Sequence, residues 1–171
     1  MDRRVLLAGL GVALAGCRPE DAQLPSVTLA PVDGLKTAAG LAVPGVSTET
    51  IGSQPLVINF WGTWCPYCRA EHAALADLAI DTRFVFVGVA IRDSDADVAA
   101  YLGAHGNPYA AVSVDHRLAL AKPLGQRGVP TKMVFGGDRQ PGGTLIGPAT
   151  DARVRTRLDE IVTRLSATRT G

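Results

Sequence analysis

Two cysteines lie three positions apart in the stretch FWGTWCPYC, residues 60–68, which includes the end of an apolar run. The chain has only one other cysteine, Cys17, near its amino end. A pair such as Cys65 and Cys68 could bind a metal ion, form a structural disulfide or act as a redox-active dithiol. The three hypotheses differ in the companion residues that each requires.

The metal and structural-bridge hypotheses find little support elsewhere in the chain. A zinc site normally uses a second Cys/His pair, and here only His72 follows, four residues after Cys68 and on the same face of a helix. Thiolates also suit Cu(I), but no Met or His cluster accompanies them, so we predict no metal site and keep a copper-handling module as an alternative. A disulfide that closes so short a loop constrains little chain entropy and would add little stability.

The local pattern favours a redox-active dithiol. The apolar residues 56–61 predict a buried strand, and Pro66 suits the first position of a helix, predicted over 66–80. A cysteine at a helix start faces unpaired backbone amides and the positive end of the helix dipole, which stabilise its thiolate. We therefore predict Cys65 as an exposed nucleophile and Cys68, one turn inside, as the thiol that resolves a mixed disulfide. Their reversible disulfide would be the redox group, with no added cofactor.

Residues beside the cysteines have predicted supporting roles. Pro66 and Tyr67 shape the start of the helix and so the redox poise, and Trp64 forms an apolar rim for a substrate. Glu71 and His72 follow the second cysteine by about one helical turn. For both, a catalytic role and a merely solvated or packing role stay open.

The remaining pattern indicates alternating strands and helices. Short strands and turns are expected over 27–55, a strand over 83–91, a helix over 95–105 capped by Ser94, a strand over 109–114 and a short helix over 118–124. Strands over 132–135 and 144–147, joined by a Gly/Pro turn over 136–143, precede a helix whose apolar stripe runs from Val154 to Leu165. This order predicts an α/β fold with a central mixed sheet flanked by helices.

The first residues differ from the rest. A short basic start precedes a run of apolar residues, 5–16, that is too short to span a bilayer and fits a secretory signal. The run ends Leu14-Ala15-Gly16-Cys17, which resembles the bacterial lipoprotein signal, in which the cysteine receives the lipid. We therefore predict a signal peptide over 1–16, a tether over 17–26 and one folded domain over 27–171.

The composition fits a single folded domain. The 171 residues are 47% hydrophobic, enough for a core of ordinary size. The 17 Lys and Arg residues are scattered among 16 acidic ones, without a basic block, which argues against nucleic acid as a partner.

Two motifs together resemble a known superfamily. WCPYC after an apolar strand, followed about sixty residues later by Gly128-Val129-Pro130, is similar to the thioredoxin superfamily over about residues 27–165. NFWGTWCPYCRAEH, and the helix and strand inserted at 95–114, resemble the membrane-tethered periplasmic reductases of the TlpA, ResA and CcmG/DsbE type. Segments 106–109 and 68–72 most resemble the cytochrome c maturation branch, CcmG/DsbE.

The resemblance implies a thioredoxin-like fold with a helix–strand insertion and a cis Pro130 that faces the dithiol. The backbone of Val129 would pair with an extended substrate. Thr131 would lie beside it, where the maturation branch commonly has an acidic residue. Asn59 stands in the strand beneath the dithiol, where thioredoxins proper carry a buried acid. Because an amide cannot accept a proton, proton transfer would fall to water or to Glu71.

The function that the resemblance implies is that of a thiol–disulfide oxidoreductase. We expect a reductase of protein disulfides, with apocytochrome c as a possible substrate and a membrane electron donor that regenerates the dithiol. An oxidase or isomerase of the same fold stays an alternative, because the reduction potential sets the direction. We expect a monomer in the periplasm or cell envelope, anchored in the membrane lipid through Cys17.

Overall fold

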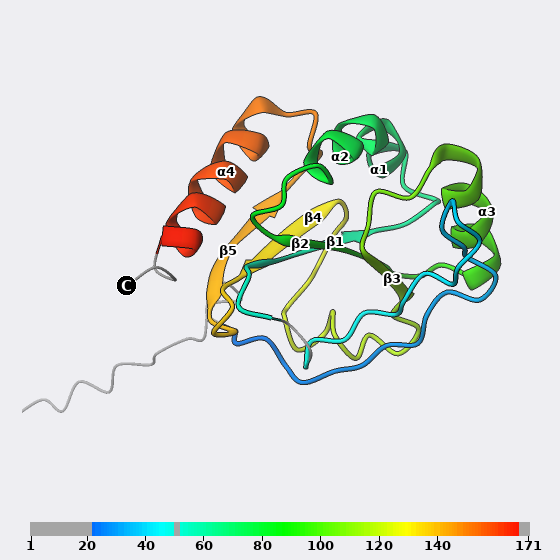
Figure 1. Cartoon of the computed structure of the whole chain (residues 1–171), viewed down its shortest axis with the longest axis horizontal. Helices are drawn as coiled ribbons and strands as arrows, with labels where there is room; N and C mark the ends of the chain where they lie inside the picture. The colour runs from blue at the N-terminus through cyan, green and yellow to red at the C-terminus, as the bar shows by residue number, and fades with distance from the viewer. Residues whose placement is uncertain (1–21, 50–51, 168–171) are drawn as a thin grey trace, which may run out of the picture.

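The computed structural model describes residues 22–49 and 52–167 (Figure 1). Its centre is a five-stranded sheet in the order β3-β2-β1-β4-β5. The strands are β1 (Leu56–Trp61), β2 (Val85–Ala90), β3 (Ala111–Val114), β4 (Thr131–Phe135) and β5 (Pro141–Ile146). The helices are α1 (Pro66–Ala70), α2 (His72–Leu78), α3 (Asp95–His105) and α4 (Ala152–Ala167).

The strand directions bring both predicted motifs to one edge of the sheet. β1 is parallel to β2, and β2 is parallel to β3, whereas β4 is antiparallel to β1 and β5 to β4. The carboxyl end of β1 therefore lies beside the start of β4, where Phe60 pairs with Thr131. The cysteines follow β1 and the Val-Pro pair precedes β4, so the topology places them together.

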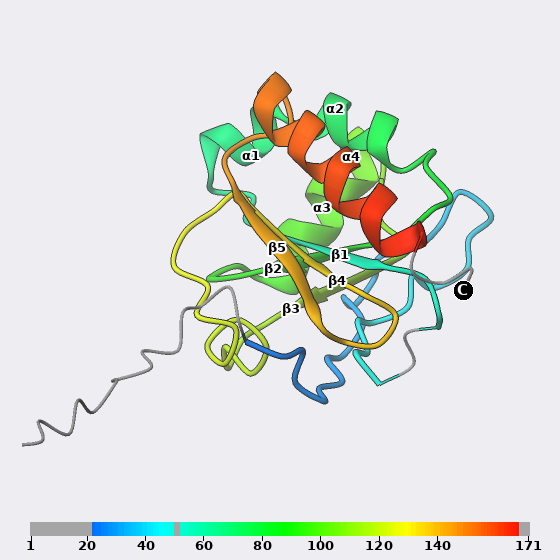
Figure 2. The same ribbon diagram turned by 90° about the vertical axis from the view of Figure 1, so that its left-hand side faces the viewer.

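The two faces of the sheet are covered by different kinds of structure (Figure 2). On one face, Val57 of β1 shares a core with Leu75 of α2, Val98 of α3 and Leu158 of α4. On the other face, Ile58 shares a core with Leu24 and Val46 of the amino-end segment and with the turns over 118–125. Further along that segment, Val32, Leu35 and Val43 join the helix-side core. The helices thus lie on one face, and irregular chain covers the other.

Much of the predicted secondary structure is confirmed. β1 and α3 have the predicted bounds, Ser94 caps α3 through a bond from the Asp97 amide, and α3 with β3 forms the predicted insertion. The predicted helix over 66–80 is divided at Glu71 into α1 and α2. β5 begins at Pro141, so the turn before it is shorter than expected.

The predicted short helix over 118–124 is wrong, and the segment forms turns instead. The buried carboxylate of Asp115 accepts hydrogen bonds from the amides of Ala119, Leu120 and Ala121 at 2.7–2.9 Å. Leu118 has a left-handed backbone, with φ 53°. A carboxylate that takes consecutive amides replaces the carbonyl partners of a regular helix, and the left-handed residue prevents helical continuation.

Residues 22–49 are an extended segment with two isolated bridges, Thr28 with Ser47 and Lys36 with Ala42. Leu24 lies within the predicted tether, yet it is buried against the second core, and its carbonyl accepts a hydrogen bond from Arg139 at 2.9 Å. The end of that segment therefore packs with the folded domain.

The predicted signal peptide and the predicted lipid-bearing Cys17 lie outside the described residues. Within 22–49 and 52–167, no helix has the length and apolar character needed to cross a membrane.

Candidate active site

Cys65 lies at the start of α1, as the sequence predicts. The turn that follows β1 is closed by a hydrogen bond from the Cys65 amide to the Gly62 carbonyl at 3.1 Å. Cys65 has an extended backbone as the N-cap residue, and its Sγ accepts a hydrogen bond from the Cys68 amide at 3.2 Å. Pro66 follows at the beginning of the helix, where a missing N–H leaves no bond unmade. The sulfur of Cys65 thus replaces the usual oxygen of a capping side chain.

The second motif lies against this sulfur. The Cys65 thiol faces the Val129 carbonyl oxygen at 3.9 Å, and the Val129–Pro130 peptide bond is cis. This confirms the cis geometry of Pro130 that the resemblance implied. Cys65 and Cys68 are free thiols, and each residue is only 3% exposed. The expectation of an exposed Cys65 is therefore wrong in this structure, because the Val129 segment covers the sulfur.

Cys68 lies deeper along the helix, and its environment keeps it protonated. Burial raises the pKa of the Cys68 thiol well above its ordinary value. The hydrogen bond with Cys65 raises this pKa further, and the Gly62 backbone lowers it by less. The charges of Cys65 and Glu71 add the smallest increases. Cys68 must therefore lose a proton before it can attack, and an acceptor near it has a chemical use.

A fully buried ion pair lies next to the dithiol. Glu71 accepts hydrogen bonds through Oε2 from the Lys132 ammonium and, at 2.6 Å, from the Ala149 amide. The Lys132 ammonium also donates to the Gly147 carbonyl oxygen at 3.1 Å. Both side chains of the pair are 0% exposed. The pair joins the α1–α2 junction to β4 and to the loop between β5 and α4.

One oxygen of this pair stays unused. Within the described part of the chain, Glu71 Oε1 is buried and has no hydrogen-bond partner. Burial lowers the pKa of Lys132, and the Glu71 carboxylate opposes that effect. A carboxylate oxygen without a donor, close enough to raise the pKa of Cys68, is suited to accept its proton.

The sequence did not point to Lys132, although the strand pattern contains a signal. Met133 and Phe135 of β4 face the irregular side of the sheet, so Lys132 and Val134 face the helices. A lysine on the buried face of an interior strand requires an acidic partner. The alternation therefore predicts that Lys132 is paired, though not with which residue.

Asn59 lies on β1 beside Lys132, with which it pairs across the strands. It is fully buried, and its Nδ2 donates to the Tyr109 hydroxyl at 2.9 Å. Burial raises the pKa of Tyr109, so this phenol stays neutral. Gly88, opposite Asn59 on β2, gives the Tyr109 ring its room, since a Cβ there would lie 2.6 Å from a ring carbon.

Trp64, the predicted rim residue, and Tyr67, predicted to shape the helix start, are both exposed beside the dithiol. Trp64 is 50% exposed and Tyr67 is 68% exposed. The Trp64 indole N–H donates to the Ile91 carbonyl at 3.1 Å and lies over Gly62, where a Cβ would come within 2.5 Å of it. Asp93 accepts hydrogen bonds from the Thr63 amide and hydroxyl at 2.6 and 2.9 Å. The loop that carries Trp64 is thus held by hydrogen bonds to the segment that follows β2.

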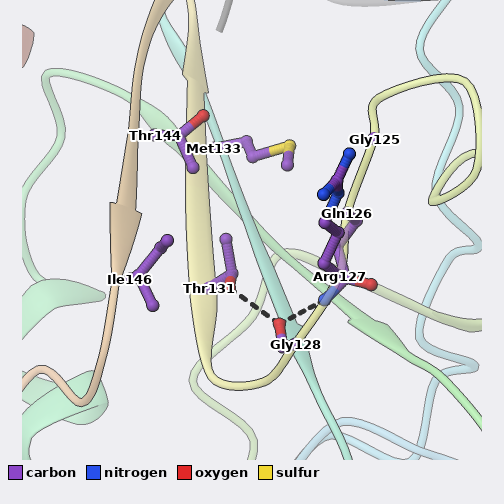
Figure 3. A pocket seen from close by; sticks show the side chains of 8 residues that line it. All are labelled: Gly125, Gln126, Arg127, Gly128, Thr131, Met133, Thr144 and Ile146. Atoms are coloured by element: carbon purple, nitrogen blue, oxygen red, sulfur yellow. Dashed lines mark hydrogen bonds between the residues drawn. The ribbon is translucent and has the colours of Figure 1, made fainter. Parts of the chain in front are cut away.

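Thr131 differs from the other predicted substrate residues, because its side chain is largely buried. Its hydroxyl donates to the Gly128 carbonyl at 2.7 Å (Figure 3). It contributes to the wall of a hollow together with Met133, Thr144 and Ile146 from β4 and β5. The segment Gly125–Gly128 forms the opposite wall.

His72 is tied to the insertion rather than to the cysteines. Its Nε2 lies 3.1 Å from the His105 carbonyl oxygen and 3.0 Å from that of Gly106, at the end of α3. Its ring meets Tyr101 edge-on at 5.2 Å. These contacts assign it a packing role. Among residues 22–49 and 52–167, no group of three His, Cys, Asp or Glu side chains is arranged for a metal ion.

Comparison with known proteins finds relatives that are named thiol:disulfide interchange proteins. The chain is 31% identical over 144 residues to the thiol:disulfide interchange protein DsbE of Pseudomonas aeruginosa, covering 76% of this chain and 77% of that protein. It is 30% identical over 120 residues to the thiol:disulfide interchange protein CycY of Rhizobium leguminosarum, covering 68% of this chain and 62% of that one. With a DsbE homologue of Paracoccus denitrificans and two further DsbE proteins, the match spans only 44–50% of the relative's length.

A solved structure and a family profile agree with these relatives. A thioredoxin family protein from Chlorobium tepidum superposes with a TM-score of 0.62 at 24% identity, covering 89% of this chain and 99% of that one, which supports the thioredoxin-like fold. The sequence profile named Redoxin matches residues 20–145, which include both cysteines, the cis-proline and the buried ion pair. The chain therefore belongs to the Redoxin family.

Proposed function

We propose that the protein is a thiol–disulfide oxidoreductase that reduces disulfides of other proteins. The observation that carries the proposal is the position of Cys65 Sγ, which caps α1 and accepts the Cys68 amide beside the Val129 carbonyl. Two thiols at a helix start, next to a backbone edge that can receive an extended peptide, are the requirements of disulfide exchange. The names of the relatives from Pseudomonas and Rhizobium support the same activity.

The reaction follows from the two sulfur environments. The Cys65 thiolate attacks one sulfur of the substrate disulfide, forms a mixed disulfide and releases the other sulfur as a thiolate that takes up a proton. Cys68 then loses its proton and attacks Cys65 Sγ, which frees the second substrate thiol. The substrate gains two electrons and two protons, and the protein is left with a Cys65–Cys68 disulfide. A membrane electron donor would reduce this disulfide again.

Glu71 is proposed as the acceptor of the Cys68 proton. It follows Cys68 by three residues, its charge raises the pKa of that thiol, and its Oε1 has no donor among the described residues. Asn59, on β1 beside Lys132, is the other buried polar residue here, but its amide cannot take a proton. The proton would therefore pass from Cys68 to the carboxylate as the mixed disulfide is resolved.

The location and substrate are proposed from the sequence. The apolar start and Leu14-Ala15-Gly16-Cys17 support an envelope protein held to a membrane by a lipid on Cys17. Segments 68–72 and 106–109, which resemble the cytochrome c maturation branch, support a substrate among the cysteines of apocytochrome c. Val129, Trp64 and Thr131 would bind the substrate segment, with Pro130 placing it.

A trapping experiment tests the proposal. A Cys68→Ala variant cannot resolve the mixed disulfide and should hold its substrate on Cys65, where mass spectrometry would identify it. Cys65→Ser should abolish reduction of insulin by the reduced protein. Full insulin reduction by Cys65→Ser would refute the mechanism. A measured reduction potential well above about −150 mV would instead assign the protein as an oxidase.

A further inference from the structure

A hollow of about 260 Å³ beside Cys65 is lined by three cationic residues. Arg92, Lys122 and Arg127 line it together with Trp64 and Val129, and no acidic residue contributes to its wall. Trp64 directly precedes Cys65, and the carbonyl of Val129 lies 3.9 Å from the Cys65 sulfur. A polypeptide attached to Cys65 would therefore have its flanking residues near this hollow.

The three cations form no ion pair in the part of the chain that the structure describes. The side chains of Arg92, Lys122 and Arg127 make no hydrogen bond or ion pair there, whereas Arg83 and Arg157 pair with carboxylates. Asp93 follows Arg92, but its carboxylate binds the amide and hydroxyl of Thr63 and forms no ion pair with Arg92 among the described residues. In a chain with a formal net charge of only +1, this is a local excess of positive charge.

Two residues in the wall of this hollow have an uncommon backbone conformation. Arg92 and Leu118, both in its wall, have φ values of 53°, the left-handed region that residues with a side chain seldom occupy. Such conformations gather at positions that bind ligands. All three cationic residues are exposed, so their charges can meet a partner without burial of an unpaired charge.

A second hollow of about 270 Å³ adjoins the first and is mainly apolar. The two share the segment Gly125–Gly128, and Met133 and Ile146 line the second (Figure 3). Ile146 is 81% exposed at the edge strand β5. The segment Gly125–Gly128, which includes Arg127, lines both hollows and so connects the cationic hollow beside Val129 to the mainly apolar one.

We propose that Arg92, Lys122 and Arg127 form an anionic-peptide site that selects substrate proteins with acidic residues next to the target disulfide. Charge complementarity carries this assignment, because unpaired cations around a reacting group raise the encounter rate of anionic partners and repel cationic ones. The neighbouring apolar hollow would receive an apolar side chain of the same segment. The proposal rests on the disulfide reductase function and defines its substrate class.

The test uses three peptides with one internal disulfide, identical except for three flanking residues that are Glu, Gln or Lys. Reduced full-length protein should reduce the Glu peptide about ten times faster than the Lys peptide at low salt, with the Gln peptide between them. This spread should collapse at high ionic strength, since exposed charges are screened. The Cys65→Ser variant, which cannot exchange disulfides, should show the same order in its Kd for the peptides.

An Arg92→Glu/Arg127→Glu variant should reverse the order of the Glu and Lys peptides. Lys36→Glu/Arg157→Glu makes the same change in net charge away from Cys65 and should leave the order intact. Equal rates and equal Kd values for the three peptides would overturn the site while the reductase function stands. A charge order in Kd with no reduction of any peptide would keep the site and overturn the reductase function.

One competing occupant is tested in the same way. If the cationic hollow served an anionic lipid surface, the wild type would bind phosphatidylglycerol vesicles, the Arg92→Glu/Arg127→Glu variant would not, and the peptides would be indistinguishable. That result would overturn the peptide site.

Discussion

At the residue scale, Lys132 and Glu71 form a buried ion pair next to the dithiol. Their charges are fully buried and compensate each other, and both act on Cys68 or its surroundings. A buried pair of this kind adds little net stability over apolar residues, but breaking it by removing one partner is costly. The pair is therefore a small source of net stability, and its presence beside Cys68 fits the proton-transfer role proposed for Glu71.

Single and double substitutions separate these effects. Lys132→Met leaves Glu71 buried without its cation and should lower the free energy of unfolding by about 3–5 kcal/mol. The double variant Glu71→Gln/Lys132→Met removes both charges, and its stability should lie within about 1–2 kcal/mol of the wild type. Urea unfolding of the wild type, the Lys132→Met and Glu71→Gln single variants and the double variant gives the comparison. Additive losses in the double variant would show that the two side chains do not act as a pair.

The same double variant tests the proton transfer. Because burial raises the pKa of Cys68, its thiol stays protonated through neutral and mildly alkaline pH, and its thiolate fraction rises about tenfold with each pH unit. Without the carboxylate, the rate constant for resolving the mixed disulfide should fall about 10²-fold at pH 7 and then climb with pH. The wild-type rate should change much less over the same range. Stopped-flow measurements would decide, and parallel pH profiles would exclude Glu71 as the acceptor.

At the scale of elements, the sequence predicted best where one local rule was sufficient. The bounds of β1 follow from an unbroken apolar run, and those of α3 from the cap at Ser94 and the turn at Gly106. The segment 118–124 was mispredicted because its amides bond to Asp115, a partner outside the pattern that periodicity measures. The position of Cys65 at a helix start was predictable, since Pro66 marks that start.

The covering of Cys65 and the pairing of Lys132 were not predictable in this way. Each depends on a contact between segments about sixty residues apart, with Val129 for Cys65 and with Glu71 for Lys132. The resemblance to a family predicts that Pro130 lies against the dithiol, because both belong to its sequence motifs. It does not predict the buried ion pair, because Lys132 belongs to neither motif.

The connection between α2, β2 and α4 supports a pH-dependent prediction. The Arg83 guanidinium pairs with Asp81 and Asp159, and its bond to Asp81 lowers the pKa of that carboxyl. A lowered pKa means that the native state favours the ionised form, so the stabilisation is present above the unfolded value of about 3.9 and is lost as the pH falls through the folded value.

Because Arg83 and Asp81 are partly exposed, Asp81→Asn should lower the free energy of unfolding by only about 0.5–1 kcal/mol at pH 7. The difference from the wild type should diminish as the pH falls below the unfolded value of about 3.9. Thermal unfolding of both proteins across pH would show it. An equal difference at pH 2.5 and pH 7 would mean that the ion pair is not its cause.

At the scale of the whole molecule, the two faces of the sheet are stabilised differently. Helices cover one face through a broad apolar core, whereas the other depends partly on polar links from Arg139 to Leu24, Ser26 and Thr48. Elements with fewer buried contacts open locally at lower free energy than the rest. The segment 22–49 should therefore be the part most sensitive to loss of one side chain.

Arg139→Ala provides that test. Amides that bond within the segment, such as those of Leu29 and Thr48, should exchange with solvent about tenfold faster or more, while those of β1 and β2 keep their protection. Hydrogen exchange followed by mass spectrometry resolves the two regions. The control is Arg164→Ala, which removes an exposed bond to Gly142 on the helix side and should leave the segment unchanged.

The attachment of Leu24 also has a mechanical consequence. Arg139 lies in the turn between β4 and β5, and β4 runs away from the cis-proline toward that turn, so Leu24 is fastened at the end of the sheet opposite Cys65. A force applied through the preceding chain would therefore act on the domain at Leu24, and the length of the sheet separates this point from Cys65. If Cys17 holds a lipid, the preceding chain is the anchor of the domain. The dithiol would then face away from the anchor, and a force on the anchor would not act on the hydrogen bonds around the two sulfurs.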